Sequence, residues 1–399
     1  MENRVPLIID NDEFFIDIGT DCIRKIKFYE VIGTGGSCLV YRGKLYDAGN
    51  EKTVIIKEYY PISQNSWAKY IRQKEHTPLI IEGTQEEINN ELLLRKINVQ
   101  RELETNKRLY VSLDGKSNNP YIFNAWEEKD ISEEFKQNSA YIIIDTAEGE
   151  TLKHALKNKK QNRYEILEAI FLVKKMLEVV RYMEEKGCIH GDLSLENIYL
   201  SGERDNQYVK FLDFGSAFFK EDYQCDENDM ESVRKIADKI VSNVSLGSSH
   251  EAICTKYIEE LADKRERYKL CGSDRYAVEL VNALKKMDIS IDLYAIVINF
   301  YKMIIGREYD VLPSVNELYN LFYGEDVEKK DDILINMLHE IFRKNGENKY
   351  KTIEMLLEDL KELQDVCSGN ITPKSLLRKL QGERIDVEFD KRLLPQILS

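Results

Sequence analysis

The stretch CIHGDLSLENIYL, residues 188–200, places His190, Asp192 and Asn197 at fixed offsets within one short loop. A second motif, Asp213-Phe214-Gly215, follows a short apolar run that predicts a strand. The two motifs in this order and at this spacing are improbable by chance. They form the sharpest constellation of polar residues in the sequence, so the fold is expected to be organised around them.

The residue types of these motifs suit one kind of chemistry. A carboxylate can receive the proton of an attacking hydroxyl, while an amide and a second carboxylate can hold the magnesium that bridges the phosphates of ATP. We expect Asp192 to take the first role, and Asn197 and Asp213 to take the second.

Length and composition indicate a folded protein of about two domains. The 399 residues are 43% hydrophobic and 32% charged, as in soluble globular proteins. The formal net charge of −14 argues against nonspecific binding to nucleic acid or to an anionic membrane surface. The seven cysteines form no CxxC pair and the five histidines no HxxxH pair. This pattern suggests no zinc site, and it indicates reduced thiols in a cytoplasm.

Neither a secretory signal nor a membrane span is expected. The first residues, MENRVPLIIDNDEFF, lack a cationic start followed by an apolar core. The longest apolar stretch, residues 291–306, is interrupted by Asp292, Asn299 and Lys302 and is too short for a bilayer. A buried helix fits this stretch better.

The first part of the chain predicts a small sheet. Residues 28–57 alternate or run apolar over short lengths, with an Asp-Ala-Gly-Asn turn, and predict three antiparallel strands. In the turn IGTGGSCLVY, the missing side chains of Gly33, Gly35 and Gly36 would let backbone N–H groups approach phosphate oxygens. Glycines of ordinary hairpins are commoner, so this turn alone is a weak signal.

Lys57 ends the strand pattern VIIK, where a lysine can reach phosphates as a point charge or can simply face solvent. Helical spacing over residues 86–110 predicts a long helix after it. This helix offers three carboxylates that could hold the lysine, Glu91, Glu102 and Glu104. Glu102 is our choice, because Leu109 lies about two turns further on and marks the same inward face.

Strand patterns at residues 121–126 and 140–145 complete the predicted sheet. From residue 152 onward helical patterns dominate. The first long one covers residues 164–186, and Gly187 is expected to end it in a left-handed conformation.

With these motifs, the chain resembles a eukaryotic-type (Hanks-type) serine/threonine protein kinase. The Gly-rich turn, VIIK, HGDLSLEN and DFG occur in the order and roughly the spacing of that family's signature motifs. The sequence VIIKEYYP resembles that of bacterial members of this family. The resemblance implies an α+β, bilobal protein-kinase-like fold with a small β-rich N-lobe and a larger, mainly helical C-lobe.

The resemblance covers about residues 28–365 and divides the chain into four parts. These are an N-terminal extension (1–27), the N-lobe and hinge (28–147), the C-lobe (148–365) and a C-terminal tail (366–399). Two connections are longer than a compact fold needs. We therefore expect insertions with helices of their own around residues 58–90 and 216–275.

The resemblance also implies the residues of the site. The catalytic set would be Asp192, Lys57, Glu102, Asn197 and Asp213, and its family counterpart makes His190 a buttress of the loop rather than a proton carrier. Ile144 would be the gatekeeper, and residues 145–147 would face the adenine. The implied cofactors are ATP and Mg²⁺ or Mn²⁺. The implied nucleotide-binding residues are Ile32, Gly33, Gly35, Gly36, Ser37, Val40, Ile55, Lys57, Ile144, Asp145, Ala147 and Tyr199.

Three features of the larger lobe carry the resemblance further. Asp292, in the predicted buried helix, would brace the catalytic loop. YAVEL, residues 276–280, resembles the APE segment, with Glu279 as its acidic residue. Lys349 stands where an arginine usually pairs with that glutamate.

The chain departs from the family at several positions. Gly191 replaces an arginine that grips a phosphorylated activation loop in many members, so switching through that arginine is not expected. Ser194 replaces the lysine that family members carry two residues after the catalytic aspartate. Glu196, two residues further on, is acidic and therefore does not supply a cation in its place. Transition-state charge would rest more heavily on Mg²⁺ and Lys57. Ile55 and Tyr199 enlarge the side chains around the base.

The expected function is transfer of the γ-phosphoryl group of ATP to Ser or Thr hydroxyls of a protein substrate in the cytoplasm. One alternative is a pseudokinase scaffold that binds nucleotide without transfer. Another is a small-molecule kinase of the aminoglycoside or choline type, whose loops also contain HGD. YAVEL, Asp292 and DFG favour the protein kinase. The sequence leaves the oligomeric state and the physiological substrate open.

Overall fold

A computed structural model describes most of the chain. The residues it describes are 3–4, 14–18, 24–34, 38–47, 50–59, 69–72, 79–82, 84–110, 119–126, 140–146, 148–202, 207–243, 256–307, 312–324 and 332–369. The expectations for Gly35, Gly36, Ser37, Ala147 and the tail beyond residue 369 lie outside the described residues. The chain forms two compact units, of which the first is Met1–Glu148 with Leu212–Gly215, and the second is Gly149–Phe211 with Ser216–Ser399.

The first unit is built on a six-stranded antiparallel sheet. Along β5, Val54 and Ile56 are fully buried, as the alternation of a β-branched strand predicts. The three strands predicted over residues 28–57 are confirmed as β3, β4 and β5. In spatial order the strands are β2 (Phe14–Ile18), β3 (Arg24–Thr34), β4 (Cys38–Asp47), β5 (Asn50–Tyr59), β9 (Ala140–Asp145) and β8 (Ala125–Trp126).

A smaller sheet of the first unit contains β1 (Asn3–Arg4), β7 (Leu79–Glu82) and β6 (Lys69–Arg72), in that order. The described part of the insertion expected before the long helix is therefore made of strands, whereas we expected helices there. The sequences KYIR and LIIE explain the difference, because aromatic and β-branched residues favour paired strands.

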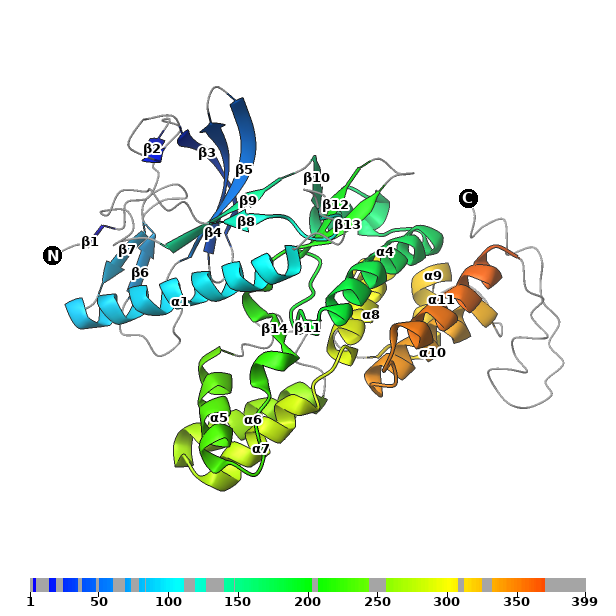
Figure 1. The fold of residues 1–399 in the computed structure, drawn as a ribbon. Helices are drawn as coiled ribbons and strands as arrows, with labels where there is room; N and C mark the ends of the chain where they lie inside the picture. Colours follow the sequence, from blue (N-terminus) through cyan, green and yellow to red (C-terminus); the bar gives the residue numbers. More distant parts are fainter. Residues whose placement is uncertain are drawn as a thin grey trace. The chain divides into compact units, whose positions relative to one another are not determined.

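The predicted long helix is confirmed as α1 (Gln85–Tyr110), which lies against β8 and β9 (Figure 1). Val99 and Leu103, one turn apart, are buried and pack with Cys38, Ala125 and Ile142 of the sheet. This packing directs one face of α1 inward and fixes which of its glutamates can reach β5.

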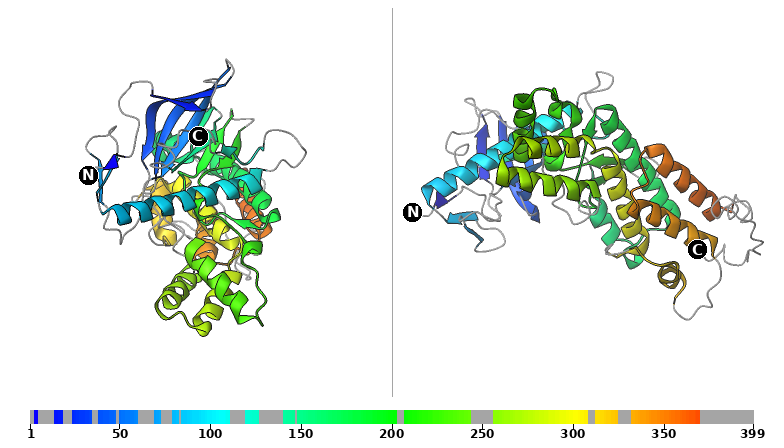
Figure 2. Two further views of the ribbon diagram at one scale, coloured as in Figure 1. Left: turned by 60° about the vertical axis from the view of Figure 1, so that its left-hand side comes forward. Right: turned by 90° about the horizontal axis from the view of Figure 1, so that it is seen from below.

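The second unit is mainly helical and centres on α8 (Ser290–Ile305), in which every residue is buried. The predicted buried helix is thus confirmed. In Figure 2 the green α4 and the yellow α8 run side by side. Gly187 follows α4 with a φ of 69°, which confirms the expected left-handed stop. In the second unit, α3 (Leu152–Lys157) and α4 (Ile166–Glu185) precede the second insertion. The helices α9 (Val315–Tyr323), α10 (Ile333–Gly346) and α11 (Ile353–Cys367) follow α8.

Two small sheets of the second unit position the motif loops. One has the order β10 (Gly149–Thr151), β12 (Ile198–Ser201), β13 (Tyr208–Phe211). The other pairs β11 (Cys188–Ile189) with β14 (Phe218–Phe219). The loop of residues 190–197 is therefore held at both ends by strands.

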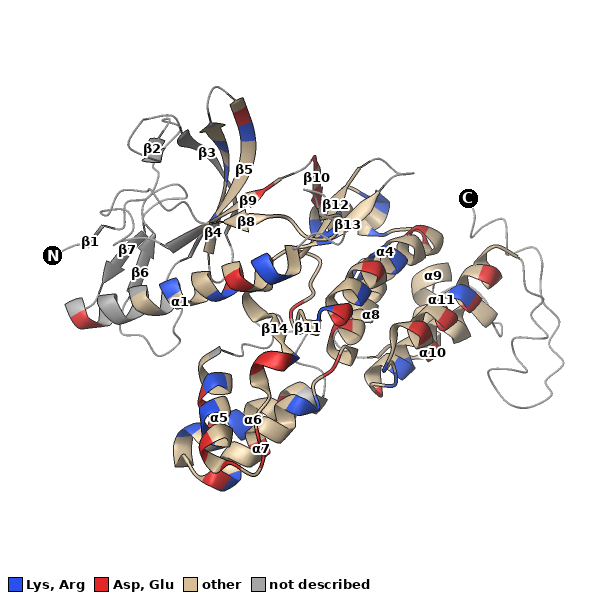
Figure 3. Cartoon of the chain, viewed as in Figure 1, with Lys and Arg blue, Asp and Glu red and all other residues tan. Residues whose placement is uncertain are grey.

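The second insertion contains helices, as predicted: α5 (Met230–Asn243) and α6 (Lys256–Cys271). A third helix, α7 (Asp274–Lys285), begins where the predicted insertion ends and packs with both. Their apolar faces share one core, which includes Val233, Ile258 and Leu280 and extends to Phe218 of β14 and Ile291 of α8. All three helices contain residues of both signs of charge (Figure 3). These three helices, here called the helical insert, thus have an apolar core joined to that of the unit.

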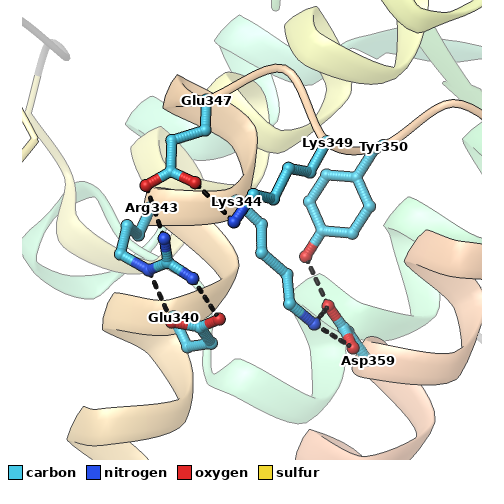
Figure 4. Close-up of polar contacts among 7 residues, drawn as sticks. All are labelled: Glu340, Arg343, Lys344, Glu347, Lys349, Tyr350 and Asp359. Carbon is cyan, nitrogen blue, oxygen red and sulfur yellow. Dashed lines mark hydrogen bonds and ion pairs between the residues drawn. The ribbon is translucent and has the colours of Figure 1, made fainter.

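The partner expected for Glu279, the acidic residue of YAVEL, is wrong. Residues 276–280 lie inside α7, and Glu279 is bound by Lys264 at 3.0 Å and by Arg275 at 2.9 Å. Lys349 pairs instead with Glu347, while its neighbour Tyr350 donates to Asp359 at 2.6 Å (Figure 4). The expected Glu279–Lys349 pair does not form, because each side chain has a closer partner on its own or a neighbouring element.

Among the described residues, no helix is long and apolar enough to span a membrane.

Replacing Phe300 with alanine should lower the free energy of unfolding by roughly 3–5 kcal/mol. Phe300 is 1% exposed in α8 and its ring centroid lies 6.2 Å from that of Phe342 in α10. Urea denaturation measures the loss, and Phe171→Ala is the control because Phe171 is 40% exposed. Equal losses for the two variants would contradict this account of the core.

A double-mutant cycle tests the corrected partners of Glu279. Glu279→Ala and Lys264→Ala should show a measurable coupling in the free energy of unfolding, because the two side chains form an ion pair. Glu279→Ala and Lys349→Ala should be additive. Coupling of Glu279 to Lys349 alone would restore the original interpretation.

Candidate active site

In the first unit, the ammonium of Lys57 contacts two carboxylates. Its Nζ lies 3.0 Å from Glu102 Oε2, 3.1 Å from Glu102 Oε1 and 2.8 Å from Asp213 Oδ1. The side chains of Lys57 and Glu102 are only 7% and 5% exposed, and that of Asp213 is 36% exposed. The structure therefore brings Lys57, Glu102 and Asp213 together. Glu102, the candidate glutamate chosen from the sequence, is the one that contacts Lys57.

Burial and charge act against each other in this cluster. Burial disfavours the ammonium of Lys57, but the carboxylates of Asp213 and Glu102 outweigh it and raise the pKa of Lys57 above its usual value. Burial also raises the pKa of Glu102 to about 7, although Lys57 opposes this shift. One cation shared by two carboxylates leaves a net negative charge, which a bound divalent cation would complement.

Asp213 adopts a strained backbone conformation. Its φ is 61°, in the left-handed region that residues with side chains seldom occupy. Such a conformation costs on the order of 1–3 kcal/mol and persists where surrounding contacts impose it. The contacts here are the bond to Lys57 and a bond from Gly215 N–H to Asp213 Oδ1 at 3.3 Å.

The predicted nucleotide-binding residues of the first unit lie on neighbouring strands. Ile55 and Ile144 face each other across β5 and β9, and Val40 is opposite both Gly33 and Lys57. Val40 and Ile144 are partly buried against the cluster that contains Cys38. The remaining two differ: Ile32 is 41% exposed, and the carboxylate of Asp145 accepts from Lys52 at 2.6 Å.

In the second unit, α8 braces the loop of residues 190–197. Asp292 accepts the backbone N–H groups of His190 and Gly191, each at 2.9 Å. Asn299 donates to the carbonyl of Leu193 at 3.1 Å. Burial raises the pKa of Asp292, while the hydrogen bonds from these two N–H groups oppose the shift.

The loop orients its own polar residues. His190 is fully buried, sits edge-on to Phe211 at 5.7 Å between ring centroids, and its Nδ1 accepts the N–H of Asp192 at 3.3 Å. Asn197 donates from Nδ2 to the carbonyl of Asp192 at 2.8 Å. These contacts agree with a buttressing His190, and they fix Asp192 and Asn197 relative to each other.

Gly191 has a φ of 75°, a conformation that glycine adopts without strain. An arginine at this position would have to adopt the same left-handed backbone. The glycine at residue 191, which supplies no cation, therefore suits the left-handed backbone conformation of the loop at this position.

Glu196 does not leave an uncompensated negative charge beside Asn197. Lys153, at the start of α3, forms an ion pair with Glu196 and donates its backbone N–H to Leu195 O at 3.0 Å. Although burial works in the other direction, the bond from Lys153, with a contribution from Lys302, lowers the pKa of Glu196. The loop thus carries nearby cations that the sequence alone did not predict.

Tyr199, the predicted nucleotide-binding residue of the second unit, lies on β12 opposite Lys210. Its ring lies beside Gly149, where an added Cβ would come within 2.8 Å of Tyr199 Cε1 and 2.0 Å of Leu200 O. The absence of a side chain at residue 149 therefore allows Tyr199 to adopt its position.

Asn197 in the second unit and Asp213 in the first each supply an oxygen donor of the kind that Mg²⁺ binds. Because Asn197 donates through Nδ2, its Oδ1 is the atom presented as a ligand, and Asp213 supplies a partly exposed carboxylate. Mg²⁺ is commonly bound by one or two protein oxygen ligands together with substrate phosphates. No group of three His, Cys, Asp or Glu side chains that could hold a metal occurs among the described residues.

Two residues beside the site were missed from the sequence. Arg101 donates to the carbonyl of Gly215, and Lys153 binds the loop as described above. Arg101 directly precedes Glu102, and this adjacency was the available signal. For Lys153 the sequence carries no such signal, because its partner is distant along the chain.

A family model, curated proteins and solved structures are similar to this chain. A family model described as "Protein kinase domain" matches residues 26–242. The human hormonally up-regulated neu tumor-associated kinase is 27% identical over 198 residues, which is 49% of this chain and 21% of that protein. A probable serine/threonine-protein kinase of Dictyostelium discoideum is 37% identical over 82 residues, 19% of this chain and 12% of that protein. The chain thus spans about a fifth or less of the length of these relatives.

Among solved structures, the kinase domain of Mycobacterium tuberculosis PknI is similar at 12% identity with a TM-score of 0.45, covering 87% of this chain and 98% of that one. A variant of the same domain gives a TM-score of 0.48 at 10% identity, covering 90% of this chain and 100% of that one.

The raised pKa of Glu102 predicts a pH effect on nucleotide binding. As the pH falls through about 7, Glu102 gains a proton and its bonds to the Lys57 ammonium weaken. The affinity for MgATP should therefore fall between about pH 8 and about pH 6 more steeply in the wild type than in Glu102→Gln, which does not titrate there. Isothermal titration calorimetry measures the pH dependence of MgATP affinity for both proteins. Protonation of ATP itself contributes equally to both and cancels in the comparison.

Glu104→Gln is the matched control, because Glu104 is an exposed residue of the same helix. It should keep the wild-type slope. Equal slopes for wild type and Glu102→Gln would show that Glu102 does not titrate in this range.

Proposed function

Because this chain belongs to the protein kinase family, whose model matches just over half of it, we propose that it transfers the γ-phosphoryl group of ATP to Ser or Thr hydroxyls of a protein substrate. The observation that carries the proposal is the buried Lys57 held by both Glu102 and Asp213. We place this activity in the cytoplasm of a bacterium, from the charge and cysteine pattern and the wording of the motifs.

In this mechanism each residue has a stated task. Lys57 binds phosphate oxygens of ATP, and Glu102 keeps its ammonium in place. The acceptor Oγ forms a bond to the γ-phosphorus, the bond from that phosphorus to the bridging oxygen breaks, and ADP leaves. Asp192 receives the hydroxyl proton. Asn197 and Asp213 would hold Mg²⁺, which would neutralise negative charge on the phosphates of ATP.

The cluster around Lys57 disfavours the pseudokinase alternative. Burying an ammonium and a carboxylate is costly, and their mutual attraction offsets the cost only with good geometry. A scaffold has no physical need for these charges together with Asp192 and Asn197. Residue 194 is a serine where the family carries a lysine, so one group that stabilises transition-state charge is missing. Loss of one such donor lowers the rate by a factor on the order of 10²–10³ in other enzymes. We therefore expect slow transfer and not its absence.

One argument against the small-molecule kinase alternative is weaker, because Glu279 of YAVEL pairs with Lys264 and Arg275 and not with Lys349. The protein kinase still fits better, because DFG and the bracing by Asp292 are both present. Protein and small-molecule acceptors are therefore compared directly in the experiment below.

The test incubates purified protein with Mg²⁺ and γ-labelled ATP, alone and with generic protein substrates. We expect label on protein, and we expect Asp192→Asn and Lys57→Met each to lose at least about 10² of the rate, because one removes the base and the other a phosphate ligand. Undiminished label in both variants would refute the catalytic assignment.

Two other outcomes distinguish the alternatives. Magnesium-dependent ATP binding without any transfer would identify a pseudokinase. Label on an aminoglycoside or choline, and on no protein, would identify a small-molecule kinase. Phosphoamino-acid analysis of labelled protein separates Ser and Thr from Tyr acceptors.

A further inference from the structure

Arg101 contacts the Asp213-Phe214-Gly215 segment directly. Its Nη2 donates to the carbonyl of Gly215 at 2.6 Å, in a partly buried position. Arg101, on α1, and Gly215 both belong to the first unit. A hydrogen bond from a guanidinium is short and strong, because the donor is charged.

The next residue of α1 binds the same segment with the opposite polarity. The carboxylate of Glu102 accepts the backbone N–H of Phe214, while Arg101 donates to the backbone carbonyl of Gly215. Two adjacent residues of one helix thus bind one amide and one carbonyl of a short backbone segment. Because both anchors are on α1, the segment is fixed to the helix at two points.

These anchors bear on the carboxylate of Asp213. The N–H of Gly215 donates to Asp213 Oδ1, the same oxygen that contacts Lys57. The two anchors, at the N–H of Phe214 and the carbonyl of Gly215, lie on either side of the Gly215 N–H. Together they restrict this N–H, and with it the orientation of the Asp213 carboxylate. The left-handed backbone of Asp213 needs such external contacts to persist.

We propose that Arg101 is a positioning residue for Asp213, which keeps the carboxylate oriented both for Lys57 and for Mg²⁺. The proposal rests on the proposed function, because it concerns the assigned metal ligand. Arg101 touches neither nucleotide nor metal in this scheme; it acts through Gly215. The position of α1 is thereby coupled to the metal ligand as well as to the phosphate-binding lysine.

The test compares Arg101→Gln with Lys107→Gln, a control that removes the same charge from an exposed position of α1. Binding of ATP is measured by calorimetry across a Mg²⁺ titration and, separately, in EDTA. In Arg101→Gln the Mg²⁺ concentration for half-maximal ATP binding should rise roughly tenfold, the factor for one lost hydrogen bond to a charged group. Binding in EDTA should stay unchanged, because the Lys57–Glu102 contact is intact. Lys107→Gln should match the wild type.

Arg101→Lys serves as the conservative variant. It keeps a cationic donor at the same position, so it should restore part of the Mg²⁺ dependence, and it keeps the test usable if Arg101→Gln does not fold. Circular dichroism of each variant reports folding. Restoration of the Mg²⁺ dependence by lysine supports positioning through the carbonyl of Gly215.

Several results would overturn the proposal. An equal loss of ATP affinity with and without Mg²⁺ would make Arg101 a merely structural tie, and so would lowered stability with an unchanged Mg²⁺ dependence. If the wild type binds MgATP but transfers no phosphoryl group, the proposed function fails while the titration still decides the role of Arg101. A wild type without any Mg²⁺-dependent binding would refute both.

Discussion

The buried ammonium of Lys57 is the interaction on which the first unit depends. It joins β5, α1 and the Asp213 segment, three parts that are far apart in the sequence. Charges so poorly exposed are tolerated only as a group, since removal of one partner from a buried pair typically costs roughly 3–5 kcal/mol. The fold therefore has to deliver all three side chains together. The apolar packing of Val99 and Leu103 against the sheet does this for Glu102, because it sets the rotation of α1 about its axis.

In the second unit, α8 has the corresponding role through a different kind of contact. Asp292 binds backbone N–H groups, and Asn299 binds a backbone carbonyl of the loop. The helix is otherwise buried among apolar neighbours, so these polar side chains have few alternative partners. The loop is thereby fixed through its backbone, and its side chains Asp192 and Asn197 remain available for chemistry.

The sequence predicted those contacts that follow from regular periodicity. Helical spacing relative to Leu109 selected Glu102, and an apolar run identified α8 with Asp292 inside it. Predictions failed where a short motif was interpreted without its local partners. YAVEL resembles the APE segment, whose glutamate was expected to pair with Lys349. Arg275, one helical turn from Glu279, and Lys264 of α6 bind the glutamate instead. Arg101 was missed although it directly precedes Glu102, because it binds a backbone carbonyl. Lys153 was missed because its partner Glu196 is distant along the chain.

Two departures from the family bear on the same regulatory property. The residue at 191 is a glycine whose left-handed backbone disfavours an arginine. The segment after Gly215 forms β14 and then the helical insert, whose described residues share a core with Ile189 and Ile291. A phosphorylation switch works by ordering a loop against a cation. Here the described part of that segment is already ordered by apolar burial, and the cation at residue 191 is missing. Displacement of α1, which carries both Glu102 and Arg101, would disturb the contacts of Lys57 and of the Asp213 segment at once.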